Sequence, residues 1–96
     1  MTQIVWSPQS LRDLDAIREY IAKDSEHYAD LTIARIFSAV ERLLRFPQSG
    51  RTVPERDEPE IREIIVGRFR MVYRHRGAMI EIATVFRASR EFPEKL

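Results

Sequence analysis

The chain has 96 residues and a formal net charge of +1, from 16 Lys and Arg against 15 Asp and Glu. This length allows a single domain, predicted to span residues 1–96, and 44% apolar with 32% charged residues is typical of a folded protein. The sequence contains no cysteine, which excludes disulfides, thiolate metal sites and thiol catalysis. It has no long apolar run and no signal-peptide pattern, so we expect a cytoplasmic protein that does not contact a membrane.

The first half of the chain predicts a short strand and two helices. Residues 2–6 are β-prone, and Ser7-Pro8 is a helix start, because Ser caps the first amides and Pro tolerates the first helical position. Apolar residues at helical spacing predict one helix over 8–23 and a second over 26–46, which Pro47 ends. The short connection predicts an antiparallel helical hairpin.

The second half predicts a loop followed by three strands. Residues 47–60 hold three Pro, one Gly and mixed charges, which is typical of a loop. Strands are expected over 61–66, 69–75 and 79–86, with a two-residue turn at Gly67-Arg68. The order β-α-α-β-β-β predicts an α+β fold, a helical hairpin packed on a small, mostly antiparallel sheet. The last ten residues are polar and are expected to end as a turn or a frayed segment.

The arginines are unevenly distributed. Fourteen of the 16 basic residues are Arg, and residues 61–90 carry seven Arg against two acids. A codon bias could explain the preference for Arg but does not explain the clustering. The two-residue period predicts that Phe69, Met71 and Tyr73 pack on the helices and that the alternate residues point to an open sheet face. The expected basic patch on that face consists of Arg62, Arg70, Arg74, Arg87 and Arg90.

Few residues suggest catalysis. There is no phosphate-binding loop, dinucleotide fingerprint or metalloprotease motif, and His27 and His75 have no partners at metal-ligand spacing, so neither a metal nor a cofactor is expected. The acidic run from Glu55 to Glu60 is expected to be a solvated loop, and Glu63 and Glu81 are expected to pair with arginines. The arginine face remains the candidate site, suited to phosphates or to an acidic protein partner.

Several short motifs occur in order along the chain: Trp6-Ser7-Pro8 with residues 11–22, Phe46-Pro47 with Gly50-Arg51, Ile61-Arg62-Glu63 with residues 69–74, and residues 80–85 running to Arg90. As an ordered set they resemble the RelE/ParE superfamily of type II toxin–antitoxin toxins. The resemblance implies two helices on a largely antiparallel sheet and a toxin that an adjacent antitoxin holds inactive. It also implies one of two activities: cleavage of messenger RNA on the ribosome, or poisoning of DNA gyrase.

The details favour a ParE-like toxin without catalysis of its own. Phe92 stands where a nuclease of this superfamily would have Tyr, and Phe cannot transfer a proton. We therefore expect a gyrase inhibitor, neutralised by a ParD-like antitoxin whose acidic segment binds along the helices or the arginine face. The alternative is a RelE-like ribosome-dependent endoribonuclease, with Arg70, Arg87 and Arg90 at the scissile phosphate. A third reading is a partner-binding module that has lost toxicity.

Overall fold

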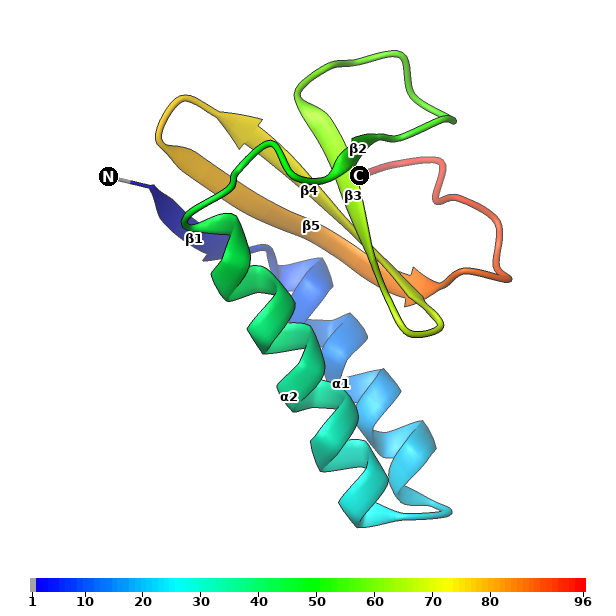
Figure 1. Ribbon diagram of the computed structural model, residues 1–96. Coiled ribbons are helices and arrows are strands. Elements are labelled where there is room, and N and C mark those ends of the chain that lie inside the picture. Colours follow the sequence, from blue (N-terminus) through cyan, green and yellow to red (C-terminus); the bar gives the residue numbers. More distant parts are fainter. Residues whose placement is uncertain (1) are drawn as a thin grey trace.

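The computed structural model describes residues 2–96 and contains two helices and five strands (Figure 1). In chain order the elements are β1 Gln3–Trp6, α1 Pro8–Ala22, α2 Glu26–Leu43, β2 Arg51–Thr52, β3 Ile61–Val66, β4 Phe69–Arg76 and β5 Met79–Arg87. The sheet order is β1-β5-β4-β3-β2, in which β1 pairs with β5 in parallel and all other neighbours are antiparallel. The predicted α+β fold is confirmed, with one strand more than expected.

Both helices begin where the sequence predicts. The Ser7 hydroxyl accepts the Ser10 amide at 3.0 Å, and the Ser25 hydroxyl accepts the Tyr28 amide at 3.0 Å, so each serine is an N-cap. The second helix ends at Leu43, three residues earlier than expected. Pro47 disfavours a helical conformation for the residue before it, so the chain leaves the helix in turns before reaching the proline.

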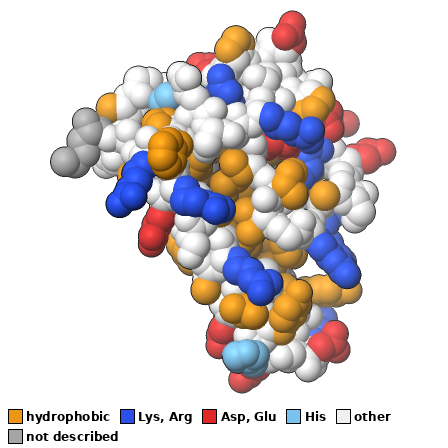
Figure 2. Space-filling view, in the orientation of Figure 1, with side chains coloured by type: hydrophobic (Ala, Val, Ile, Leu, Met, Phe, Trp, Pro, Cys, Tyr) orange, Lys and Arg blue, Asp and Glu red, His pale blue; other side chains and the backbone are white. Residues whose placement is uncertain are grey.

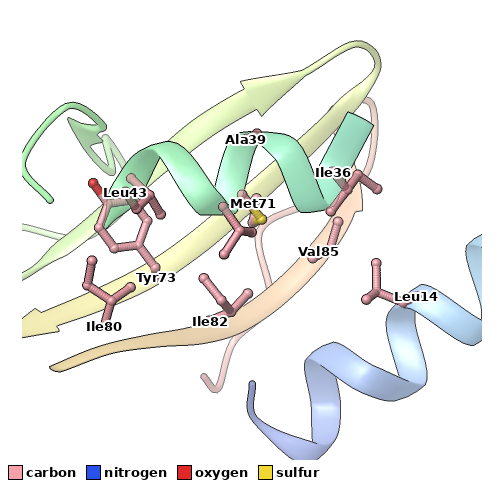
Figure 3. Close-up of a cluster of buried hydrophobic side chains, with 10 residues drawn as sticks. Leu14, Ile36, Ala39, Leu43, Met71, Tyr73, Ile80, Ile82 and Val85 are labelled. Atoms are coloured by element: carbon pink, nitrogen blue, oxygen red, sulfur yellow. The ribbon is translucent and has the colours of Figure 1, made fainter. Parts of the chain in front are cut away.

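The helical hairpin covers one face of the sheet. Apolar side chains of α1 and α2 meet those of β4 and β5 in the main hydrophobic core (Figure 3). As predicted, Met71 and Tyr73 face the helices, and both are fully buried. A register shift opposite Val72 and Tyr73 lets Ile82 and Val85, three positions apart on β5, share this core. No helix within residues 2–96 combines the length and apolarity needed to cross a membrane.

The extra strand lies inside the predicted loop 47–60. Arg51 pairs with Glu63 and Thr52 with Arg62, so β2 covers a short part of the β3 edge. Gly50 enables this approach, because a methyl group there would lie 2.6 Å from both the Glu63 carbonyl oxygen and the Tyr73 hydroxyl. Such a close approach of backbone to a distant strand leaves little signal in a sequence.

The second face of the sheet is covered, and the prediction that it is open is wrong. Val72 of β4 and Phe86 of β5 are buried there with Val53 and Ile61, and Phe92 and Leu96 pack against them. The last residues (88–96, the tail) therefore fold back over this face. Of the two expected endings, the turn is present just after β5, and the frayed segment is not observed. The physical reason is the apolar character of Val72 and Phe86, which a loop and the tail shield from water.

Candidate functional site

The five arginines predicted as one patch lie in three different places. Arg62 is paired with Tyr73 in the sheet register and therefore shares the helix-facing side, where its Nη1 donates to the Gly50 carbonyl at 2.9 Å. Arg70 and Arg74 belong to the second face, whereas Arg87 and Arg90 line a groove near the helices. The prediction of a single basic patch is therefore wrong.

Arg70 is buried in an internal ion-pair network. It is 8% exposed, and its Nε donates to Glu63 at 2.6 Å while its two terminal nitrogens donate to Glu55 at 2.9 and 2.7 Å. Arg51 donates to the other oxygen of Glu63 at 2.6 Å. The hydrogen bonds from Arg70 lower the pKa of Glu55 to about 2, and Glu55 in turn raises the pKa of Arg70. Carboxylates engage three of the five N–H donors of this guanidinium, and its burial leaves little of it open to a ligand.

The remaining predicted residues on the second face are also paired. Arg74 donates to Glu81 at 3.0 Å and to the carbonyl oxygen of Leu96 at 3.3 Å. The expectation that Glu63 and Glu81 pair with arginines is confirmed. The acidic loop is solvated as expected, since Glu55, Asp57 and Glu60 are exposed, although Glu55 also pairs with Arg70 and Glu60 with Arg76.

A groove of about 670 Å³ opens between the helical hairpin and the nearby end of the sheet. Figure 1 shows why: the connection between α1 and α2 projects beyond the sheet, so the outer turns of the hairpin have no strand above them. Helix α1 contributes Ile17, Tyr20 and Ile21, and α2 contributes Tyr28 and Thr32. The sheet side consists of the β3–β4 turn and the end of β5, with Val66, Gly67, Phe69 and Val85 among its residues.

Four arginines line the groove: Arg35, Arg68, Arg87 and Arg90 (the groove arginines). None of them takes part in the seven ion pairs formed within residues 2–96. In Figure 2, basic side chains flank apolar ones where α2 approaches the end of the sheet. The groove therefore combines an apolar floor with unpaired positive charge at its rim.

The aromatic side chains of the groove are partly open to solvent. Tyr20 is 61% exposed and Tyr28 is 53% exposed, and the Arg87 guanidinium lies over the Tyr20 ring at 5.6 Å. Exposed tyrosines beside arginines are typical of protein interaction surfaces. Sequence reasoning missed this aromatic pair, although their positions on either side of the interhelical turn were a usable signal.

Sequence reasoning also missed Arg35 and Arg68. Arg68 is placed by the two-residue turn that was predicted: Gly67 has a φ of +58°, while Arg68 stays outside the left-handed region, as a type II′ turn requires. Its carbonyl oxygen accepts the Ala88 amide at 2.8 Å, which ties the turn to the end of β5. Arg35 lies one turn after Thr32 on α2 and so shares its face.

The charged groups that line the groove are suited to binding an acidic partner. The carboxylate that lines it is that of Asp13, and one of its oxygens accepts the Thr84 hydroxyl at 2.5 Å and the Val85 amide at 3.0 Å. No histidine is found among the lining residues that the structure describes. Arginines over an apolar floor, with the acid already engaged, suit an acidic amphipathic segment.

Comparisons with known proteins agree on one family. Residues 4–92 match the family described as the ParE toxin of the type II toxin–antitoxin system parDE. A protein named as a candidate toxin, Y4kP, from Sinorhizobium fredii is 36% identical over 95 residues, covering 98% of this chain and 96% of the relative. The toxin RelE2 of Caulobacter vibrioides is 35% identical over 66 residues, covering 69% of this chain and 70% of the relative.

A solved structure shares the fold. It is described as the chromosomal ParDE toxin–antitoxin system from P. aeruginosa, and it matches with a TM-score of 0.75 over 91% of this chain and 96% of that chain. The sequence identity is 24%, so this similarity concerns the arrangement of helices and strands alone.

Proposed function

Because the chain belongs to the ParE toxin family of type II toxin–antitoxin systems, we propose that it binds and inhibits DNA gyrase and that a cognate antitoxin neutralises it. One observation carries this proposal: the arginines are divided into a paired set on the second face and an unpaired set around an apolar groove. The paired set helps to decide between gyrase inhibition and RNA cleavage, and the unpaired set helps to locate the antitoxin site.

The paired set argues against the nuclease alternative. That alternative needs Arg70, Arg87 and Arg90 around one phosphate, but Arg70 is buried on the second face and the other two line the groove. Arg70 is also covered by Phe92, which lacks the hydroxyl that acid–base work would use. An inhibitor that acts by binding needs no such cluster, and this favours gyrase over messenger RNA as the target.

The unpaired set supports a ParD-like antitoxin as the partner. A segment with apolar side chains on one side and Asp or Glu beside them would cover Tyr20 and Tyr28 and pair with the groove arginines. Burying these aromatic side chains would supply most of the affinity, and the charges would set the orientation. The groove, rather than the second face, is therefore the proposed antitoxin site.

Two assays on the purified protein test the activity. At micromolar concentration it should block supercoiling by gyrase or stabilise cleaved DNA, and mixing it first with the product of the neighbouring antitoxin gene should restore supercoiling. The same preparation should leave messenger RNA intact on programmed ribosomes. Cleavage of the message without any effect on gyrase would favour the endoribonuclease instead. Unchanged growth when the gene is expressed without antitoxin would indicate a module that has lost toxicity.

A further inference from the structure

The tail crosses from the groove to the second face within a few residues. After β5, the Ala88 amide donates to the Arg68 carbonyl at 2.8 Å, and the Arg90 amide donates to the Arg87 carbonyl at 2.9 Å. Arg90 lines the groove, yet Phe92, two residues later, packs on the opposite side of the sheet. The position of Arg90 therefore depends on what holds the chain on either side of it.

On the far side, Phe92 rests on Arg70. The Arg70 guanidinium lies 5.3 Å from the centre of the Phe92 ring and 5.4 Å from that of Phe86. The two rings also meet edge to face, with centroids 5.9 Å apart. Because Glu55 and Glu63 fix Arg70 through three hydrogen bonds, Phe92 packs on a rigid charged group rather than on a mobile one.

We propose that Arg70, acting through Phe92, is a positioning residue for partner recognition in the groove. The pairing of Arg70 with Glu55 and Glu63 holds the Phe92 ring, and the held ring keeps Arg90 at the rim of the groove before the partner arrives. Arg70 itself never touches the partner. This inference rests on the proposed antitoxin site, and it gives the buried ion-pair network a role in binding as well as in stability.

The physical basis is preorganisation. An exposed arginine on a free tail would have to be ordered when a partner binds, and the lost conformational freedom would oppose binding. With Phe92 anchored, the backbone part of that freedom is already lost in the unbound protein. Removing the Phe92 ring should therefore weaken binding although no contact with the partner is deleted.

A double-mutant cycle on Arg90 and Phe92 tests the inference. Titration calorimetry would measure the dissociation constant of the antitoxin for the full-length wild type, for Arg90→Ala, for Phe92→Ala and for the double variant. Each single change should weaken binding by about fivefold, the scale of one partly exposed charged contact, and the double variant should be hardly weaker than either. Glu94→Ala, an exposed change in the same tail, is the matched control and should leave the constant unchanged.

Two further measurements separate positioning from general loss of structure. Phe92→Tyr keeps a ring over Arg70 and should restore the wild-type constant, whereas Phe92→Leu keeps apolar cover without the ring and should not. In the unbound protein, ¹⁵N relaxation should show larger ps–ns motion at residue 90 in Phe92→Leu than in wild type, with unchanged values in α1 and α2.

The outcomes are distinguishable from those that test the proposed function. Additive losses in the cycle, unchanged motion at residue 90, or full binding by Arg90→Ala would overturn the positioning role and leave the groove as the antitoxin site. If the wild type does not bind the antitoxin at all, the proposed function fails, and the relaxation data alone then decide whether the ring holds residue 90.

Discussion

The two faces of the sheet use the same residue type in opposite ways. On the second face, Arg70 and Arg74 are paired with carboxylates and shielded by the tail. Around the groove beside the helices, arginines line an apolar floor without any ion pair among residues 2–96. An arginine can therefore bind a partner only where no carboxylate of the protein itself already pairs with it. The net charge of +1 and even the local excess of arginines describe both faces equally and distinguish neither.

The largest expected effect concerns stability on the paired face. Arg70→Met should lower the free energy of unfolding by about 3–5 kcal/mol, because it leaves the fully buried Glu63 side chain with Arg51 alone and removes the support for Phe92. Urea denaturation monitored by circular dichroism would measure the change in the free energy of unfolding.

The matched control lies on the other face. Arg87→Met removes an arginine that forms no ion pair in the described structure and should cost less than about 1 kcal/mol. Equal losses for the two variants would mean that the distinction between paired and unpaired arginines has no energetic content.

The next largest effect is expected at the groove, where charge reversal should weaken antitoxin binding and leave the free energy of unfolding unchanged. The double variant Arg35→Glu with Arg68→Glu should raise the dissociation constant of the antitoxin by about 100-fold or more, because two attractive charges at the groove become repulsive. Its free energy of unfolding should stay within about 0.5 kcal/mol of wild type. Calorimetric titration and urea denaturation on the same preparation would provide both values.

Arg12→Glu is the control for a general charge effect. It makes one such reversal on α1, where Arg12 is exposed and bonded only to Gln9. Binding should change by less than about threefold, as expected of a charge outside the interface that acts through screened long-range forces. If Arg12→Glu weakens binding as much as either groove arginine does, net charge rather than the groove would govern recognition.

The comparison also separates what a sequence can predict from what it cannot. The two-residue period correctly predicts the core face of Met71 and Tyr73, because this signal is local and repeats. The same period correctly predicts that Arg70 points to the other face of the sheet from Tyr73. Pairing of Glu63 with an arginine is predicted from the charge pattern, but nothing local indicates that Glu55, fifteen positions before Arg70, completes the pairing.

The groove was out of reach for a related reason. It depends on the angle at which the helical hairpin leaves the sheet, which is a tertiary property. Arg87 and Arg90 are predicted binding residues, but they lie away from the face of Arg70. Arg87 pairs with Phe69 in the sheet and shares its helix-facing side, and Arg90 follows in the turn after β5. Their role in binding a partner stays a prediction.

A smaller effect is expected where the helix-facing core meets a polar loop. The Tyr73 hydroxyl donates to the Pro47 carbonyl at 2.8 Å and accepts the Gly50 amide at 3.1 Å, and burial raises the pKa of this phenol. Tyr73→Phe should cost about 1–2 kcal/mol, because two backbone groups lose their partner.

Thermal unfolding would show this loss as a lower Tm, while antitoxin binding in the groove should be unaffected. A change in affinity without a change in Tm would indicate that the loop after α2, rather than the groove alone, belongs to the interface. Such a result would extend the binding surface to the opposite end of α2.

The smallest effect is a pH dependence that only the paired face should show. The pKa of Glu55 falls from 4.5 to about 2 on folding, chiefly through its hydrogen bonds from Arg70. A depressed pKa contributes stability that is fully present above the unfolded value and is lost as the pH falls from about 4.5 towards 2. The free energy of unfolding should therefore decline less steeply over this range in Glu55→Gln than in wild type. Because the Glu55 side chain is 43% exposed, solvent screening keeps the difference small.

The matched control for this slope is Asp57→Asn, an exposed acid of the same loop without an ion pair in the described part of the chain. Its pH profile should run parallel to that of wild type. Added salt should reduce the Glu55 difference, since the pair lies partly in solvent. If the free energy of unfolding instead depends on pH equally in Glu55→Gln and in wild type, the pair between Arg70 and Glu55 adds nothing to stability. The contribution of Arg70 would then come from its pair with the buried Glu63 alone.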